Sequence, residues 1–127
     1  MRSATRAFVR QRAGDRCEYC QLHQDDSPLA ALHIEHIRPR KHGGTDDDAN
    51  LCLACIDCNL HKGSKLTGID PHSDVTTPLF HPRDQKWADH FESNGIQIVG
   101  KTAIGRTTIR VLCMNSDEQL ELRMADE

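Results

Sequence analysis

The sequence predicts a small mixed α+β domain, and three features of the 127-residue chain indicate it. Residues 2–13 carry arginines at helical spacing and are followed by Gly14, which is typical of a helix and its end. Residues 29–37 are apolar with β-branched residues near their end, which favours a strand. Residues 87–102 hold an Asn-Gly pair between two runs of alternating apolar residues, a strong hairpin signal.

Composition limits both the core and the class of protein. Hydrophobic residues make up 37% of the chain and aromatic residues 4%, so we expect a thin core. The formal net charge of −3 excludes a histone-like protein that binds nucleic acid by bulk charge. No apolar run approaches the roughly 18–20 residues of a membrane span, and no apolar signal segment is found at the N-terminus. We therefore expect a cytoplasmic protein with no membrane partner.

Six cysteines are many for a chain of this length, and four of them form two C-x-x-C pairs. The pairs are Cys17 with Cys20 and Cys55 with Cys58. In an intracellular chain such pairs indicate a metal site, and four thiolates form a closed tetrahedral site typical of structural Zn²⁺. Zinc binding contributes on the order of 10 kcal/mol in small zinc modules and would offset the thin core. A thioredoxin-like redox pair and two local disulfides are the alternatives.

Two cysteines have no C-x-x-C partner, Cys52 and Cys113. The simplest prediction is that both are buried small hydrophobic residues. Cys52 lies close to the second pair in the sequence and is also a competing zinc ligand.

A turn-rich segment, residues 67–78, divides the chain. We expect a first part of residues 1–66, with a basic helix and the cysteine pairs, and treat residues 67–78 as a linker. The remaining part, residues 79–127, is expected to be an extension of a hairpin and helices packed on the first part. Residues 102–114 fit one face of a helix, although a strand over 107–112 is also possible.

Two further predictions concern this second part. Ser116 with Gln119 has the spacing of a capping box, which predicts the start of a final helix. Trp87 and Phe91 are the best candidates for its small core.

The segment between the cysteine pairs carries an ordered motif: Glu35-His36, Pro39, Gly43-Gly44, Asn50-Leu51, Cys55-x-x-Cys58, Asn59 and Lys62-Gly63. In these residues and this order, residues 12–64 resemble the zinc-bearing branch of the HNH endonuclease family. The resemblance implies the ββα-metal fold (the HNH or His-Me finger), in which two strands and a helix clasp one catalytic divalent ion. It also implies a phosphodiester hydrolase that acts on DNA.

The same resemblance implies roles for four residues. His36 would be the general base that activates water, and Glu35 and Asn59 would hold the catalytic ion. Asn50 would hold the loop that orients His36. The family more often has Asp at the position of Glu35, and many members have His at that of Asn59; an all-oxygen pair favours Mg²⁺ or Mn²⁺. His61 is an alternative ligand.

Basic residues near the motif are candidate phosphate contacts. Five arginines occur among the first sixteen residues, opposed only by Asp15. The predicted nucleic-acid-binding residues are Arg6, Arg10, Arg38, Arg40, Lys41 and Lys62. The acidic run 46–48 is expected to be a solvated loop.

The sequence leaves three functions in competition. The first is a metal-dependent DNA endonuclease. The second is a zinc-stabilised nucleic-acid-binding module without catalysis, which fits every feature except the coincidence of Glu35, His36 and Asn59. The third is a component that acts only with a partner docked on residues 79–127.

Overall fold

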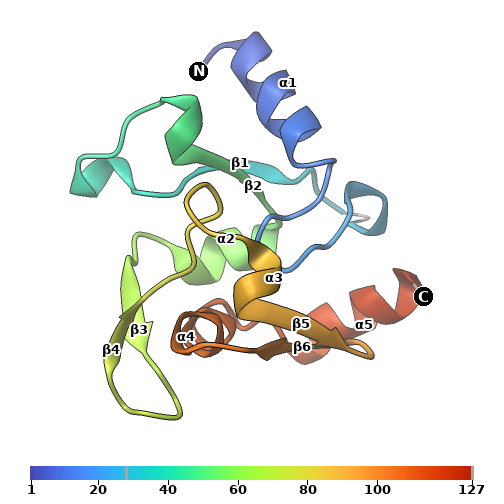
Figure 1. Cartoon of the computed structure of the whole chain (residues 1–127). Coiled ribbons are helices and arrows are strands. Elements are labelled where there is room, and N and C mark those ends of the chain that lie inside the picture. The colour runs from blue at the N-terminus through green and yellow to red at the C-terminus, as the bar shows by residue number, and fades with distance from the viewer. Residues whose placement is uncertain (28, 127) are drawn as a thin grey trace.

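Three two-stranded antiparallel sheets and five α-helices make up the computed structural model, which describes residues 1–27 and 29–126 (Figure 1). The helices are α1 (Ser3–Arg12), α2 (Ile56–Lys62), α3 (Trp87–His90), α4 (Ala103–Leu112) and α5 (Asp117–Asp126). The strands are β1 (His33–His36), β2 (Leu51–Ala54), β3 (Thr67–Ile69), β4 (Thr76–Pro78), β5 (Phe91–Asn94) and β6 (Gln97–Gly100). None of the described helices has the length and apolar character needed to cross a bilayer.

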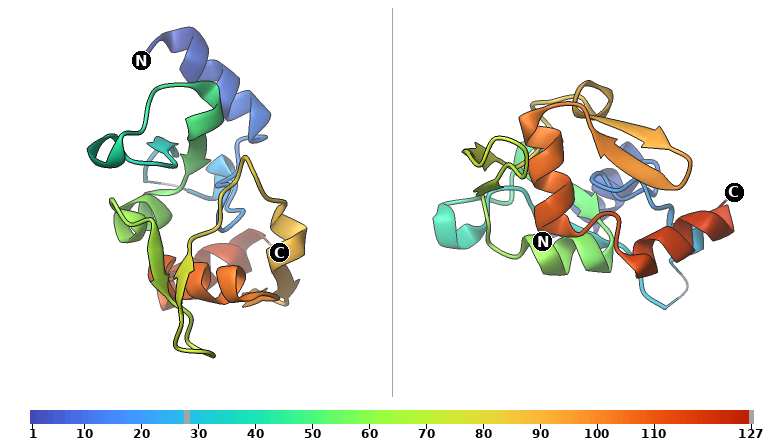
Figure 2. Two further views of the ribbon diagram at one scale, coloured as in Figure 1. Left: turned by 60° about the vertical axis from the view of Figure 1, so that its left-hand side comes forward. Right: turned by 90° about the horizontal axis from the view of Figure 1, so that it is seen from below.

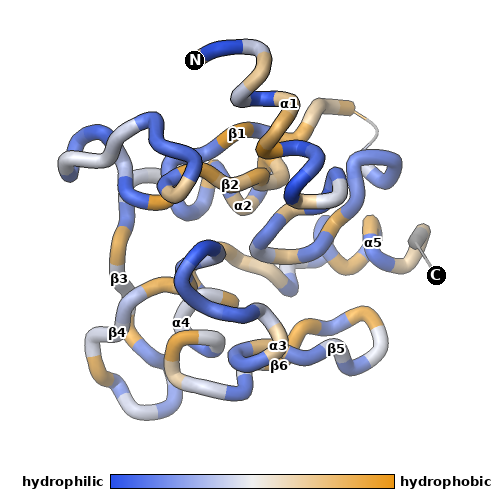
Figure 3. The backbone as a smooth tube through the Cα atoms, turned by 45° about the horizontal axis from the view of Figure 1, so that its top comes forward, coloured by the Kyte–Doolittle hydropathy of each residue, from blue (hydrophilic) through white to orange (hydrophobic). Residues whose placement is uncertain are grey.

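The centre of the molecule is the β1–β2 sheet, which lies between α1 and α2, with α4 beyond α2 (Figures 1 and 2). Its register pairs His33 with Ala54 and His36 with Leu51. All four residues of β2 are buried, and the strand is hydrophobic along its whole length (Figure 3). A strand covered on both faces needs such a continuous apolar run. The β1–β2–α2 succession is the predicted ββα arrangement.

The predicted basic helix is present as α1, and it ends where Gly14 adopts a left-handed conformation with φ of 63°. Val9 is its buried residue. Two of its arginines fasten it to the central sheet. Arg10 donates a hydrogen bond of 2.8 Å to the carbonyl oxygen of Leu32, and Arg12 donates one of 2.7 Å to that of Leu51.

The predicted hairpin of the second half is formed by β5 and β6. Asn94 pairs with Gln97 at the end of the strands, so Gly95 and Ile96 form the two-residue turn. Gly95 has φ of 63°, which suits the first central position of a type II′ turn. The Asn-Gly pair therefore marks the turn, with only its glycine inside it.

Residues 102–114, for which helix and strand were both open, form helix α4. The Thr102 side chain caps this helix by accepting a hydrogen bond from the backbone N–H of Gly105. Gly105, Thr107, Thr108 and Leu112 are its buried residues. Their spacing places them on one face, which explains why a helix forms here.

Residues 67–78 are more than the expected linker, because β3 and β4 pair across them as a hairpin. The buried carboxylate of Asp70 accepts two hydrogen bonds from Arg106 of α4, at 3.0 and 2.9 Å. The contact with Arg106 holds the pKa of Asp70 well below its usual range. The strands have three residues each, too short to produce the alternation by which a strand is predicted.

Candidate metal centre and catalytic pocket

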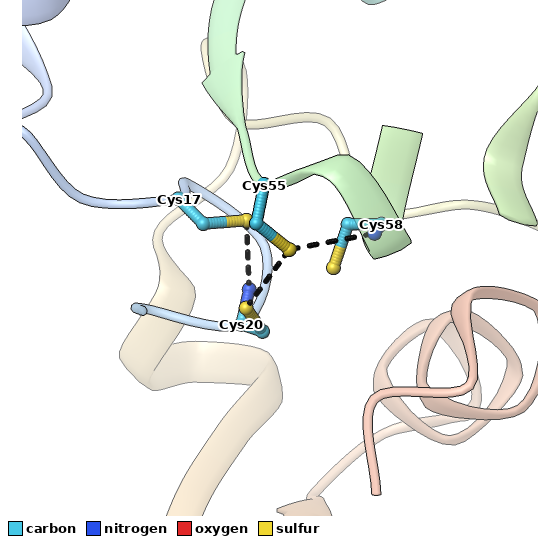
Figure 4. A group of neighbouring side chains, drawn as sticks. All are labelled: Cys17, Cys20, Cys55 and Cys58. Carbon is cyan, nitrogen blue, oxygen red and sulfur yellow. Dashed lines mark hydrogen bonds between the residues drawn. The ribbon is translucent and has the colours of Figure 1, made fainter. Parts of the chain in front are cut away.

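The sulfur atoms of four cysteines, two from each end of the HNH-like segment, lie close together (Figure 4). Cys17 and Cys20 lie in the loop after α1, Cys55 precedes α2 and Cys58 lies in its first turn. All four are buried, and their sulfur atoms lie within 4.8 Å of one another. The sulfurs of Cys20 and Cys55 are 3.6 Å apart. Thiolates around a tetrahedral Zn²⁺ at about 2.3 Å are roughly 3.8 Å apart, so the cluster fits zinc.

The electrostatics of the cluster also favour a cation. Contacts with Cys17 and Cys55 raise the pKa of both Cys20 and Cys58, while contacts with the neighbouring thiols lower the pKa of Cys55. Buried thiolates in contact repel one another, and a divalent ion removes that penalty. A disulfide needs sulfurs about 2.05 Å apart, and all six cysteines, each of them a described residue, are free.

Cys52 does not join the cluster, so the prediction that it competes for zinc is not supported by its position. It is buried, as expected, and its sulfur lies 3.7 Å from the Tyr19 hydroxyl and 3.6 Å from Oε2 of Glu35. Burial raises the pKa of the Cys52 thiol well above its usual value. Cys113 differs from expectation, because it is only half-buried at the end of α4.

The second half of the chain contacts the cysteine cluster directly. Nε2 of Gln119, in α5, lies 3.5 Å from the sulfur of Cys55 and 3.1 Å from Oδ2 of Asp57. The backbone N–H of Gln119 donates to the Ser116 hydroxyl, which is one of the two bonds of the predicted capping box; the Gln119 side chain turns to Cys55 and Asp57 and does not complete it. The Trp87 indole donates a hydrogen bond of 2.7 Å to the carbonyl oxygen of Tyr19, between the first two cysteines. No sequence signal pointed to the contacts of Gln119 with Cys55 and Asp57 or of Trp87 with Tyr19, because they join residues more than sixty positions apart.

A second centre is a cavity of about 270 Å³ at the end of β1. It is lined by Ile34, Glu35, His36, Pro39, Arg40, Asn59 and Gly63. β1 contributes the acid-His pair, and α2 contributes the asparagine from the facing side. The structure thus brings Glu35, His36 and Asn59 around one cavity. His61 is exposed and does not line it.

His36 has a carboxylate partner that the sequence interpretation assigned to a solvated loop. Nε2 of His36 lies 2.7 Å from Oδ1 of Asp46. Arg40 donates a hydrogen bond of 2.7 Å to the same oxygen. The hydrogen bond with His36, reinforced by Arg40, lowers the pKa of Asp46. A feature of the motif that could have indicated Asp46 is its place just after the Gly-Gly loop.

Asn50 holds the loop between β1 and β2 with three side-chain hydrogen bonds. Its Oδ1 accepts from the Arg38 N–H at 2.8 Å, and its Nδ2 donates to the carbonyl oxygens of Arg38 at 3.0 Å and Thr45 at 2.8 Å. The loop passes so close to itself that a Cβ on Gly44 would lie 1.7 Å from the Arg38 carbonyl oxygen. Only glycine fits there. These contacts hold the segment that carries Asp46.

Glu35 is buried, and its two carboxylate oxygens differ in environment. Oε1 accepts no hydrogen bond from the described residues, while Lys62 Nζ lies 3.5 Å from it. Oε2 lies 3.6 Å from the Cys52 sulfur. Burial raises the pKa of Glu35, and the nearby Lys62 ammonium acts against that shift. A buried oxygen without a hydrogen bond, beside an asparagine in the same cavity, is an arrangement that fits a divalent cation.

The phosphate contact predicted for Lys62 is wrong in this structure. The side chain is 2% exposed, and Nζ donates a hydrogen bond of 3.0 Å to the carbonyl oxygen of Ile37. It also pairs with Glu35. The lysine thus turns inward under β1 and supports the site from within, where DNA does not reach it.

The other side chains predicted to contact phosphate differ in their exposure and in the hydrogen bonds they make within the protein. Arg6, Arg38, Arg40 and Lys41 are exposed. Arg38 donates to the His42 carbonyl oxygen within the loop, and Arg40 pairs with Asp46. Arg10 is half-buried and is engaged with the carbonyl oxygen of Leu32. Arg6 and Arg10 line one cavity with His33 and Ile34, beside the catalytic pocket.

Residues 17–65 match the family model described as HNH endonuclease. The matched segment contains the cysteine cluster, the β1–β2–α2 unit and the whole lining of the cavity at the end of β1. This segment is similar to the HNH endonuclease family, and its four clustered cysteines fit the zinc-bearing form. Comparisons with curated proteins and with solved structures returned no match. Helix α1 and residues 66–127 lie outside the matched segment.

Proposed function

We propose that the protein is a metal-dependent endonuclease that hydrolyses phosphodiester bonds in DNA. The observation that carries the proposal is the cavity shared by Glu35, His36 and Asn59 within the HNH segment. A base and two oxygen donors around one solvent-accessible space are the groups that phosphodiester hydrolysis requires. The exposed basic side chains of Arg6, Arg38 and Lys41 provide charge for a polyanionic substrate.

His36 is the general base of the proposed reaction. Imidazole is the side chain best suited to accept a proton near neutral pH. It removes a proton from the attacking water as the water oxygen bonds to phosphorus. The bond between phosphorus and the leaving oxygen then breaks, and the strand is nicked. Asn50 keeps the His36 side of the pocket in place through its three bonds to the loop.

Glu35 and Asn59 are the proposed ligands of the catalytic ion. Their oxygens are hard donors, which suit Mg²⁺ or Mn²⁺ better than a soft metal. When bound, the ion stabilises negative charge on the phosphate and on the leaving oxygen. The Lys62 ammonium lies 3.5 Å from Oε1 of Glu35 and opposes the rise in pKa that burial causes, which favours the ionised carboxylate that a cation would bind. The zinc ion of the cysteine cluster has a structural role in this proposal, because four protein ligands leave no open position.

The proposal is tested by plasmid nicking with Mg²⁺, Mn²⁺ or Ni²⁺, with zinc content measured in each sample. His36→Ala is expected to abolish nicking and to leave the zinc content unchanged, because His36 lies outside the cysteine cluster. His61→Ala is the matched control and is expected to nick at the wild-type rate, since His61 is exposed outside the cavity.

One outcome contradicts the role of His36, and another contradicts the endonuclease itself. Cleavage retained by His36→Ala removes the assignment of the base. A positive gel shift with intact plasmid under all three metals favours the non-catalytic nucleic-acid-binding module.

A further inference from the structure

The His36 ring is held through one nitrogen and open at the other. Nε2 lies 2.7 Å from Oδ1 of Asp46, whereas Nδ1 has no hydrogen bond to any described residue. Contact with His36, and then with Arg40, lowers the pKa of Asp46, so its carboxylate is ionised at neutral pH. An ionised carboxylate only accepts hydrogen bonds. The proton of the neutral imidazole therefore lies on Nε2.

We propose that Asp46 is a positioning residue that holds neutral His36 in the Nε2–H tautomer and directs the Nδ1 lone pair to the attacking water. This inference rests on the proposed endonuclease function and assigns the ring nitrogen that accepts the proton. Asp46 touches neither water nor phosphate in this role; it acts through His36. A carboxylate also stabilises the imidazolium formed when His36 takes the proton.

Asp46 is itself held in place from two sides. Arg40 donates to the same Oδ1 at 2.7 Å, so the carboxylate cannot rotate away without losing two charge-assisted contacts. The preceding residue, Thr45, is fixed by the Asn50 amide at 2.8 Å. The close passage of Gly44 over Arg38 fixes the path of the loop to Asp46. The loop therefore carries its carboxylate to a defined position.

The neighbouring acids provide internal controls. Asp47 and Asp48 follow Asp46 in the same loop and are exposed. Neither side chain makes a hydrogen bond or ion pair among the described contacts, whereas Asp46 makes two. All three contribute equally to the negative charge of the loop. A role that depends on loop charge alone is therefore shared by all three, and a role that depends on His36 belongs to Asp46 only.

The first experiment measures nicking and DNA binding separately. Asp46→Asn is expected to lower kcat by about ten- to a thousand-fold, by analogy with the loss of the orienting acid in a Ser-His-Asp triad. The Kd for DNA is expected to stay the same or to tighten, because a negative charge near the substrate is removed. Asp48→Asn is the matched control and retains the wild-type kcat. A kcat of Asp46→Asn within twofold of wild type overturns the inference, as does an equal loss in Asp48→Asn.

The second experiment reads the tautomer without any cleavage. Nitrogen-15 NMR of the zinc-loaded full chain, without a second divalent ion and at a pH where imidazole is neutral, distinguishes Nε2–H from Nδ1–H. The His36 signals are identified by their loss in His36→Gln. Wild type is expected to show Nε2–H, and Asp46→Asn a mixture of both tautomers.

An Nδ1–H signal in the wild type, or an unchanged ratio in Asp46→Asn, overturns the inference. Failure of the proposed function is distinguishable from this, because the wild type would then leave plasmid intact while the tautomer is still measured.

Discussion

Lys62 and Glu35 form a buried pair of opposite charges at the cavity that Glu35, His36 and Asn59 line. Glu35 is 6% exposed and the Lys62 side chain 2%. Removing one member of such a pair leaves the other charge buried without compensation, which costs more than the pair contributes. The pair therefore matters both for stability and for keeping the Glu35 carboxylate available.

Lys62→Met is expected to lower the free energy of unfolding by about 3–5 kcal/mol at neutral pH, because Glu35 then loses its counter-charge. The double variant Glu35→Gln with Lys62→Met removes the buried charge altogether and is expected to recover most of that loss. Urea denaturation of the four proteins of this cycle, at one zinc concentration, measures both effects. Equal stability of Lys62→Met and wild type would contradict the pairing.

The sign of the pH dependence follows from Glu35. Burial raises its pKa above the usual value of 4.5, so the folded state binds a proton more readily than the unfolded state. The stability linked to this proton is present below 4.5 and is lost as the pH rises through the raised pKa. Without Lys62 the pKa rises further. The stability difference between Lys62→Met and wild type is therefore expected to be smaller at pH 5.5 than at pH 7.5, measured by urea denaturation at each pH.

The loop between β1 and β2 acts as one element that holds Asp46 against His36. Pro39 precedes its first helical turn, Gly43 follows that turn with φ of 85°, and Asn50 closes the loop with three side-chain bonds. Two adjacent positions of this loop, 43 and 44, favour glycine for different physical reasons. Gly43 requires a left-handed conformation but has open space around its Cα, whereas Gly44 has ordinary dihedral angles but no space.

Gly43→Ala is expected to cost about 1 kcal/mol, since only the backbone conformation is disfavoured. Gly44→Ala is expected to do more, because its Cβ would lie 1.7 Å from the Arg38 carbonyl oxygen and 2.9 Å from Nδ2 of Asn50. The loop must open, and Asp46 must move from His36. We expect a larger fall in Tm and a loss of nicking in Gly44→Ala only. Wild-type nicking by Gly44→Ala would show that the loop path is not needed.

The two halves of the molecule meet at the cysteine cluster. α5 brings Gln119 to the sulfur of Cys55, and the segment before β5 brings Trp87 to the backbone between Cys17 and Cys20. Arg83 forms an ion pair with Glu18, which also lies between Cys17 and Cys20. The second half therefore supports the zinc site, although it lies outside the HNH segment.

Gln119→Leu is expected to weaken zinc binding by about ten- to a hundredfold, because the amide beside Cys55 is an outer-shell donor to a metal ligand. Gln97→Leu is the control, since Gln97 is exposed on β6. Competition with a chromophoric chelator measures the affinity of each. If Gln119→Leu and wild type bind zinc with equal affinity, the Gln119 amide does not support the metal site, and the second half contributes only packing around it.

Short-range sequence patterns were sufficient to predict much of the candidate site. The C-x-x-C spacing predicted the cysteine cluster, because two intervening residues let a pair bind one ion. The order of Glu35, His36 and Asn59 predicted the residues that line the pocket, and the arginine spacing predicted α1. Each of these depends on residues near one another in the sequence, or on a motif whose spacing reflects a common fold.

Tertiary contacts decided the rest. Lys62 has a surface-type side chain, and only the packing of α2 against β1 buries it beside Glu35. Asp46 is one of three adjacent acidic residues, and only the folded path of the loop places its carboxylate within hydrogen-bond distance of His36. Gln119 has the spacing of a cap, yet its side chain serves a cluster sixty-four residues away. The amino-acid sequence alone establishes which chemical groups are present and how they are spaced along the chain. Which of them are buried, paired or turned inward depends on contacts between distant segments, and those exist only in the folded chain.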